Sequence, residues 1–397
     1  MDLRFSEEQE AIRETARSIV KRLEPRRDQL RKSIFVDQVF PPEIWDAMAD
    51  AGLMGALIPT EYGGSGLGLL PLALAIEQMA GEGYAGALVV VTAMDTACIL
   101  RNGSEALKKR ILPNVASGKL KLCFALTEAN AGTNAFRIAT RAQKTKDGDY
   151  ILSGEKTFIT GADVADLMLV VTRTTTPEEC KAQGFPKTFG FSLFLVDPNA
   201  KGISKTRLNT RGIEGYKQWT IHFDQVHVSK ENLVGEQDAG SIALFNSLNP
   251  ERILAATIAC GFSDYLIRQS VKYANERKLF RDTPIGAYQG VSHPLADLQI
   301  ELEATRWLAY HAAWAFDQEL SPDEVAYWGN SAKYKASELG VRAADRAIQT
   351  HGGAGFDEDL GIIHYWNAVR LLKTAPINNE MILNFIAEHK LGLPRSY

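Results

Sequence analysis

The segment Leu122–Leu126, with the sequence Leu-Cys-Phe-Ala-Leu, marks the point at which the hydrophobic pattern of this chain changes. The segment is short and apolar, and four further runs rich in β-branched or aromatic residues follow it. Gly, Asp, Asn and Pro bound these runs, which is typical of β-strands joined by turns. They lie at residues 150–152, 168–171, 191–196 and 219–223. We therefore predict a small β domain that begins at residue 122.

Helical patterns lie on both sides of this domain. From Ser6 to about residue 118, and again from Ser241 nearly to the end, apolar residues recur at helical spacing. The helical and strand patterns do not alternate, and no GxGxxG motif follows a strand, so a Rossmann nucleotide domain is disfavoured. The pattern predicts an α+β multidomain chain. Its expected domains are helical over residues 1–121, β over residues 122–234 and helical over residues 235–397.

Composition narrows the class of protein. The chain has 397 residues, of which 45% are hydrophobic and 23% charged, and its net charge is -4. No basic stripe indicates a nucleic-acid partner. The four cysteines are far apart and form no CxxC or Cys/His set, which disfavours a disulfide framework and a metal site. The longest apolar run, residues 85–91, is far shorter than a membrane span of about 20 residues, and no targeting pattern opens the chain. We expect a cytoplasmic protein with no membrane partner.

Residues 248–252, Leu-Asn-Pro-Glu-Arg, predict the first turn of a helix. Asn249 is a good N-cap, and Pro250 suits the first helical position. Glu251 then lies where the helix dipole favours its ionised form, while burial against an apolar ligand would raise its pKa. A carboxylate in this position can act as a general base. The alternative is an exposed acidic residue with an exposed Arg252 beside it.

Two motifs in the predicted β domain carry a family resemblance. The motifs are residues 126–134, Leu-Thr-Glu-Ala-Asn-Ala-Gly-Thr-Asn, and residues 156–160, Lys-Thr-Phe-Ile-Thr. They resemble the Thr-Glu-x-x-Ala-Gly-Ser-Asp loop and the Lys-x-Trp-Ile-Thr strand of the acyl-CoA dehydrogenase family. Without that resemblance they are a glycine turn and a strand with one face in the core. The resemblance covers essentially the whole chain, and it implies bound FAD, a barrel-like middle domain and a C-terminal four-helix bundle.

Two motifs in the C-terminal half extend the resemblance. Residues 273–289 are similar to the family's Tyr-x-x-x-Arg-x-x-Phe-Gly-x-Pro-Ile-x-x-x-Gln, and residues 349–356 to its Gln-x-x-Gly-Gly-x-Gly. In the family these motifs reach the FAD of a neighbouring subunit, where a guanidinium can fork onto two pyrophosphate oxygens. The resemblance therefore implies a homo-oligomer, a dimer or a dimer of dimers. The glycines equally suit a helix C-cap.

The resemblance transfers functional roles to named positions. Thr133, Asn249 and Arg252 are the residues it implies for substrate binding. The residues that it implies for cofactor binding are Leu126, Thr127, Gly132, Thr133, Phe158, Thr160, Arg277, Phe280, Gln289, Gln349, Gly352 and Gly353.

The family's chemistry removes an α-proton with a glutamate while a β-hydride passes to flavin N5. Most members carry this glutamate near the C-terminus in Tyr-Glu-Gly-Thr, but Pro376 occupies that position here. The isovaleryl-CoA and long-chain branches place it in Leu-x-x-Glu-Arg, which matches residues 248–252. Glu251 is therefore the predicted base, with Glu380 in reserve.

Pro376 also has no backbone N–H for the thioester oxygen. Loss of one such donor typically costs about 10²–10³ in rate. We expect the N–H of Ile377 or Asn378 to serve instead, or the chemistry to differ from ordinary dehydrogenation.

The resemblance predicts an FAD-dependent acyl-CoA dehydrogenase of β-oxidation that forms the trans-2-enoyl-CoA and passes electrons to an electron-transferring flavoprotein. Two alternatives remain open. One is another flavoenzyme on the same scaffold, such as an acyl-CoA oxidase, an enoyl-CoA reductase or a desulfinase. The other is a non-catalytic FAD-binding subunit of a hetero-oligomer. The sequence carries a weak preference for a branched, cyclic or long acyl group over a short straight one.

Overall fold

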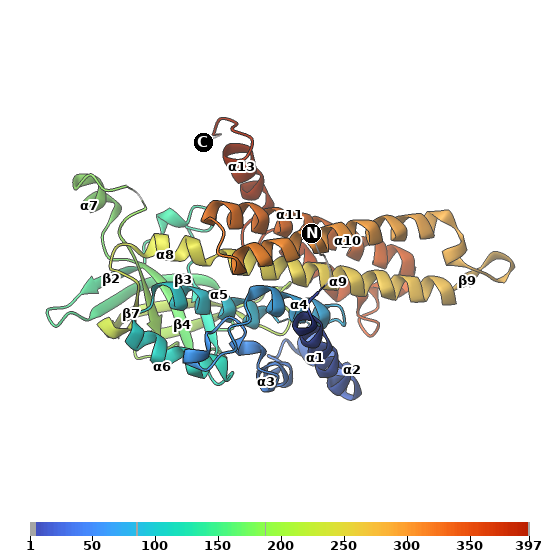
Figure 1. Cartoon of the computed structure of the whole chain (residues 1–397), viewed down its shortest axis with the longest axis horizontal. Coiled ribbons are helices and arrows are strands. Elements are labelled where there is room, and N and C mark those ends of the chain that lie inside the picture. The colour runs from blue at the N-terminus through green and yellow to red at the C-terminus, as the bar shows by residue number, and fades with distance from the viewer. Residues whose placement is uncertain (1–4, 85, 187, 396–397) are drawn as a thin grey trace.

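The computed structural model describes residues 5–84, 86–186 and 188–395. It confirms the predicted order of helices, then strands, then helices. In Figure 1 the sheet lies at one end of the molecule, and the long C-terminal helices extend away from it.

The N-terminal domain is built around two buried helices. In α5 every residue from Leu88 to Ile99 except Val91 is buried, and in α4 every residue except Gln78 is buried. A helix that is apolar on all sides belongs inside a protein rather than on its surface. The helices of this domain are α1 (Glu7–Leu23), α2 (Arg27–Arg31), α3 (Pro42–Asp50), α4 (Leu69–Ala80), α5 (Ala87–Asn102) and α6 (Glu105–Ala116).

The middle domain is a mixed eight-stranded sheet in the order β6-β7-β3-β2-β4-β5-β8, with β1 parallel to β4. Helix α7 (Pro177–Ala182) lies between β4 and β5. Strands β2 and β6 were not predicted, because they are polar and take their extended form from pairing with β3 and β7. The strands are β1 (Leu122–Ala125), β2 (Arg141–Lys144), β3 (Tyr150–Thr160), β4 (Leu167–Arg173), β5 (Phe191–Val196), β6 (Ile203–Leu208), β7 (Gln218–Val228) and β8 (Leu233–Val234).

Three helices of 28, 29 and 30 residues dominate the C-terminal domain. At 1.5 Å per residue, each is about 40 Å long. The chain therefore leaves the sheet along α9 and turns back at the far end, through the hairpin of β9 (Lys278–Leu279) and β10 (Thr283–Pro284). The helices are α8 (Gly240–Ser247), α9 (Asn249–Glu276), α10 (Gln289–Asp317), α11 (Pro322–His351), α12 (Ile362–Leu371) and α13 (Asn379–His389).

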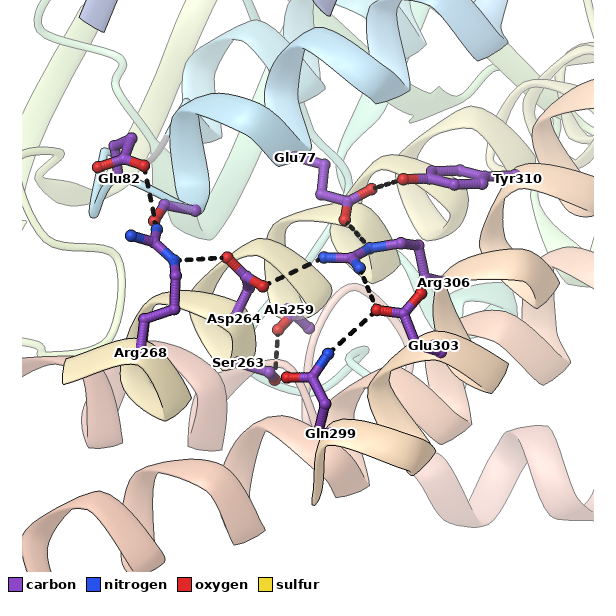
Figure 2. Close-up of polar contacts among 11 residues, drawn as sticks. Glu77, Glu82, Ala259, Ser263, Asp264, Arg268, Gln299, Glu303, Arg306 and Tyr310 are labelled. Carbon is purple, nitrogen blue, oxygen red and sulfur yellow. Dashed lines mark hydrogen bonds and ion pairs between the residues drawn. The ribbon is translucent and has the colours of Figure 1, made fainter. Parts of the chain in front are cut away.

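A buried ionic cluster joins the N-terminal domain to this bundle (Figure 2). Glu77 of α4 accepts hydrogen bonds from Arg306 Nε and Tyr310 Oη of α10, both at 2.5 Å. Arg306 also contacts Asp264 of α9 at 3.4 Å. Burial raises the pKa of Glu77, and the charge of Arg306 opposes that rise. We call these four residues the α4–bundle clamp.

Two further observations bear on the environment of the protein. Cys98, Cys123, Cys180 and Cys260 are all free and buried. Within the described ranges, no helix combines the length and the apolar character needed to cross a membrane.

Candidate active site

Helix α9 begins at the sheet end of the bundle, and its first turn carries Glu251. The predicted N-cap at Asn249 is wrong, because Leu248 occupies that position and has helical backbone angles (φ -77°, ψ -13°). Helix α8 thus passes into α9 without the extended residue that an N-cap requires. The side chain of Asn249 instead accepts a hydrogen bond from Arg252 Nη1 at 3.1 Å. Pro250 lies in the first turn, as predicted.

Glu251 and Arg252 are both partly buried, so the alternative of an exposed pair is wrong. Burial raises the pKa of Glu251 to about 7, although the charges of Arg252 and Lys333 oppose the rise. Burial also lowers the pKa of Arg252 to about 10, which leaves it cationic at neutral pH. The Glu251 carboxyl therefore titrates near neutrality, where a general base is most effective.

Lys333 of α11 anchors the segment 374–380 close to Glu251. Its side chain is 1% exposed, and its Nζ donates to the carbonyl of Ile377 at 2.5 Å and to Asn379 Oδ1 at 2.9 Å. Burial and the charge of Arg252 lower the pKa of Lys333 to about 7. A buried amine with two acceptors holds this segment in place, because breaking either contact would leave a polar group unpaired.

The same segment contains a cis peptide bond between Ala375 and Pro376. Asn378 Nδ2 donates to Thr133 Oγ1 at 3.0 Å, which links the segment to the loop of residues 126–134. Within the described ranges, the backbone N–H groups of Ile377 and Asn378 donate to no protein acceptor. Glu380, the reserve candidate, is exposed in the first turn of α13. The loop, the segment and the start of α9 therefore form one continuous site.

A buried ion pair shapes the loop of residues 126–134. Lys156 of β3 is fully buried, and its Nζ lies 2.7 Å from Glu128 and 2.9 Å from the carbonyl of Leu126. Glu128 also accepts hydrogen bonds from the backbone N–H groups of Ala139 and Thr140. Burial lowers the pKa of Lys156 to about 8, while Glu128 opposes that change. Both residues lie within the motifs of the predicted β domain, but the sequence analysis assigned a role to neither of them.

Phe158 has an unusual conformation. Its φ is 57°, at an irregularity in the β3–β7 pairing, and its side chain is 59% exposed. A left-handed backbone at a bulky residue costs about 1–3 kcal/mol and is concentrated at functional sites. Strand β3 does bury part of its surface, as the alternative expected, but Phe158 lies outside the buried part.

Nearby residues hold the backbone around Phe158. Thr157 N–H donates to the carbonyl of Thr127 at 2.8 Å, and Thr160 accepts from Gln218 at 2.7 Å. A Cβ added at Gly132 would meet no atom within 4 Å. An outward aromatic face beside open backbone fits a flat ring system such as a flavin.

The other predicted cofactor residues lie at the opposite end of the bundle (Figure 1). A ring contact of 4.5 Å between Tyr273 and His351 brings the ends of α9 and α11 together there. Phe280 is 80% exposed, and Gly352 is the C-cap of α11 with a φ of 59°. Within one chain, these far-end residues are separated from Phe158 by the length of the bundle. The far-end residues, all exposed, are Arg277, Phe280, Gln289, Gln349, Gly352 and Gly353.

Sequence reasoning missed two buried ionisable residues near Glu251. Asp95 is 0% exposed on α5, and Glu251 is among the groups that raise its pKa. A lone acidic residue inside an apolar helix was a signal that could have found it. Lys333 lies on a helix with polar residues on several sides, so its burial had no signal in the sequence.

Comparisons with known proteins identify the family of the chain. Models of the N-terminal, middle and C-terminal domains of acyl-CoA dehydrogenases match residues 6–119, 123–226 and 238–391. The chain is 40% identical to the acyl-CoA dehydrogenase FadE12 of Mycobacterium tuberculosis, over 89% of each chain. It is 32% identical to a 3-(aryl)acrylate reductase of Clostridium sporogenes, over 98% of this chain and 99% of that one.

Solved structures show the same fold. The butyryl-CoA dehydrogenase of Megasphaera elsdenii has a TM-score of 0.90 and 26% identity, covering 98% of this chain and 100% of its own. A glutaryl-CoA dehydrogenase in complex with glutaryl-CoA has a TM-score of 0.90 and 29% identity, covering 100% and 98%. The FAD complex of PigA has a TM-score of 0.88 and 28% identity, covering 99% and 100%.

Fold and site together define a flavin-dependent oxidoreductase. The chain belongs to the acyl-CoA dehydrogenase family. It is an FAD-dependent enzyme that dehydrogenates acyl-CoA thioesters.

Proposed function

We propose that Glu251 removes the α-proton of an acyl-CoA during its conversion to the trans-2-enoyl-CoA. The observation that carries this proposal is a partly buried carboxyl with a pKa of about 7 at the start of α9, beside the segment that Lys333 anchors. FAD bound at this site would supply the acceptor for the β-hydride. Arg252 and Asn249, which hydrogen-bond to each other, position the first turn and the acyl group near it.

The thioester oxygen needs donors that stabilise the enolate charge. We propose that the N–H groups of Ile377 and Asn378 supply them in place of the one that Pro376 lacks. Neither group is engaged by a protein acceptor within the described residues, and Lys333 fixes the backbone that carries them. Thr133, held by Asn378, lies at the edge of the same site and contributes a further contact to the substrate.

The cofactor is proposed to lie between two chains. Thr127, Gly132 and Phe158 belong to the group at the sheet end, and Arg277 and Gln349 belong to the group at the far end. About 40 Å of α9 separates the two groups in one chain. A neighbouring copy that presents its far end to the sheet end of this chain would complete the site, as a dimer or a dimer of dimers. The full sheet-end group is Leu126, Thr127, Gly132, Thr133, Phe158 and Thr160.

We further propose that the enzyme works in cytoplasmic β-oxidation and passes electrons to an electron-transferring flavoprotein. Four free, buried cysteines suit a reducing compartment. A structure of the electron transferring flavoprotein of Acidaminococcus fermentans is among those that share this fold. The proposed domain boundaries stay at residues 121 and 234.

The direct test is anaerobic mixing of the FAD-loaded protein with a panel of acyl-CoAs that differ in chain length and branching. We expect one class of acyl-CoA to bleach the flavin absorbance in a single turnover. The class that bleaches fastest identifies the substrate. If no saturated acyl-CoA reduces the bound flavin, dehydrogenation is the wrong reaction for this site.

Reduction of an acrylate-type double bond is a second candidate, favoured by the likeness to the 3-(aryl)acrylate reductase. Chemically reduced enzyme would then be reoxidised by the unsaturated compound faster than the oxidised enzyme is reduced by the saturated one. The opposite order of rates supports dehydrogenation. Rapid reoxidation by molecular oxygen would instead indicate an oxidase.

A mixing experiment tests the shared site. Glu251→Gln chains and Arg277→Ala chains should each be nearly inactive alone. Reassembled at equal amounts, they should recover about a quarter of the wild-type activity, because half of the random dimers hold one intact site of two. As a matched control, a Glu251→Gln/Arg277→Ala double variant mixed with wild-type chains forms mixed dimers without an intact site. No recovery from the single variants would contradict a site shared between chains.

A further inference from the structure

Asp95 is a buried carboxyl that no protein group satisfies. Its side chain is 0% exposed, and neither of its oxygens has a hydrogen-bond partner within the described residues. A buried polar group without a partner costs several kcal/mol by transfer scales, and such groups in native proteins require an explanation. Asp95 is the one acidic residue of α5, and most of the other buried side chains of this helix are apolar.

The neighbours of Asp95 on α5 show which way it faces. One turn earlier, Thr92 Oγ1 donates to the carbonyl of Leu122 on β1 at 3.1 Å. One turn later, the thiol of Cys98 points to the carbonyl of Ala243 on α8 at 4.0 Å. Residues three apart on a helix share a face. Asp95 therefore faces the junction of β1, α8 and α9, close to Glu251 in the first turn of α9.

The surroundings of Asp95 determine the protonation state of its carboxyl group. Burial raises the pKa of Asp95 well above its usual value, and the negative charge of Glu251 raises it further. The charges of Arg252 and Lys333 oppose the rise in the pKa of Glu251, but no cation is among the groups that shift the pKa of Asp95. A carboxyl that is fully buried and has no hydrogen-bond partner is most stable in its neutral form, which has one O–H donor and free acceptor oxygens.

We propose that Asp95 selects acyl groups that carry a hydroxyl or carbonyl oxygen a few bonds beyond the reacting carbons. This inference rests on the proposed function, which places the α-carbon of the substrate at Glu251. An oxygen on the acyl chain would supply the hydrogen-bond partner that the protein itself does not. A plain hydrocarbon chain would leave the buried acid unpaired, and sites with unpaired polar groups reject such analogues strongly.

The chemistry of the site favours a neutral polar group over a charged one. A second carboxylate on the acyl chain would be placed beside Glu251 in a medium of low dielectric constant, where like charges repel strongly. A neutral hydroxyl can accept from the Asp95 O–H and donate to its carbonyl oxygen. A ketone can accept from the O–H alone.

The test compares matched acyl-CoAs on the FAD-loaded enzyme. The probes are pentanoyl-CoA and hexanoyl-CoA with their γ-hydroxy, δ-hydroxy and δ-oxo derivatives. In the wild type we expect at least one oxygenated probe to exceed its plain partner in kcat/KM by about tenfold, the value of one hydrogen bond in a buried site. Asp95→Leu should abolish or reverse this preference. Asp95→Asn, whose amide both donates and accepts, should retain it.

The outcomes separate this inference from the proposed function. A purely structural role for Asp95 would change kcat/KM for plain and oxygenated probes alike, and an unchanged ratio in Asp95→Leu would overturn the inference. If Asp95→Leu does not fold, the wild-type enzyme alone can overturn the inference, which happens when every plain probe has a higher kcat/KM than its oxygenated partners. If neither these probes nor any acyl-CoA of the panel described above reduces the flavin, the proposed function fails, and the inference fails with it. If the panel reduces the flavin but no oxygenated probe exceeds its plain partner, the inference alone fails.

Discussion

Glu251→Gln is expected to slow flavin reduction by a saturated acyl-CoA by about 10²–10⁴-fold, the usual contribution of a general base. Glutamine keeps the size and polarity of the side chain but cannot accept a proton. Stopped-flow absorbance of the FAD-loaded variant, mixed anaerobically with the best substrate, measures the effect. The matched control is Glu380→Gln, which alters an exposed carboxylate on α13 and should leave the rate unchanged.

The same residue predicts a pH dependence. Glu251 accepts a proton only when ionised, and its pKa is about 7. The value of kcat/KM should therefore rise about tenfold per pH unit below that pKa and level off above it. The slope should disappear from the residual activity of Glu251→Gln. An unchanged rate in Glu251→Gln, or a loss of rate in Glu380→Gln, would move the role of base away from α9.

Glu77→Ala is expected to lower the free energy of unfolding by about 3–5 kcal/mol, because it leaves Arg306 charged and without its buried partner. Tyr310 would lose its acceptor as well. Equilibrium unfolding in urea, followed by tryptophan fluorescence and circular dichroism, measures the change. The effect is large because the α4–bundle clamp joins two domains, with Glu77 only 6% exposed.

Two controls accompany this prediction. Glu82→Ala breaks a more exposed pair with Arg268, so it should cost less than about 1 kcal/mol. The double replacement Glu77→Met/Arg306→Met removes both charges together and should recover much of the lost stability. If Glu77→Ala is no more destabilising than Glu82→Ala, the clamp does not hold the domains together.

Local pattern and local motifs carried the prediction of the fold. Helical and strand periods depend on residues a few positions apart, so they can be recognised in the sequence without a structure. Polar strands such as β2 and β6 have no period of their own and exist because a neighbour pairs with them. The predicted N-cap at Asn249 failed for a related reason. Helix α8 leads directly into α9, and a cap can form only where the preceding residue is extended.

By itself, the sequence determined the order of the domains and the family, and it predicted Glu251 as the base in place of the position that Pro376 occupies. Each of these depends on residues that are neighbours along the chain. Only the tertiary structure decided that Lys333 and Asp95 lie near Glu251. The resemblance already implied that the predicted cofactor residues act from two different chains, and the tertiary structure showed that the two groups lie at opposite ends of α9. Burial, and the pKa shifts that follow from it, depend on which distant segments pack together. The packing of distant segments cannot be recognised in a local sequence pattern.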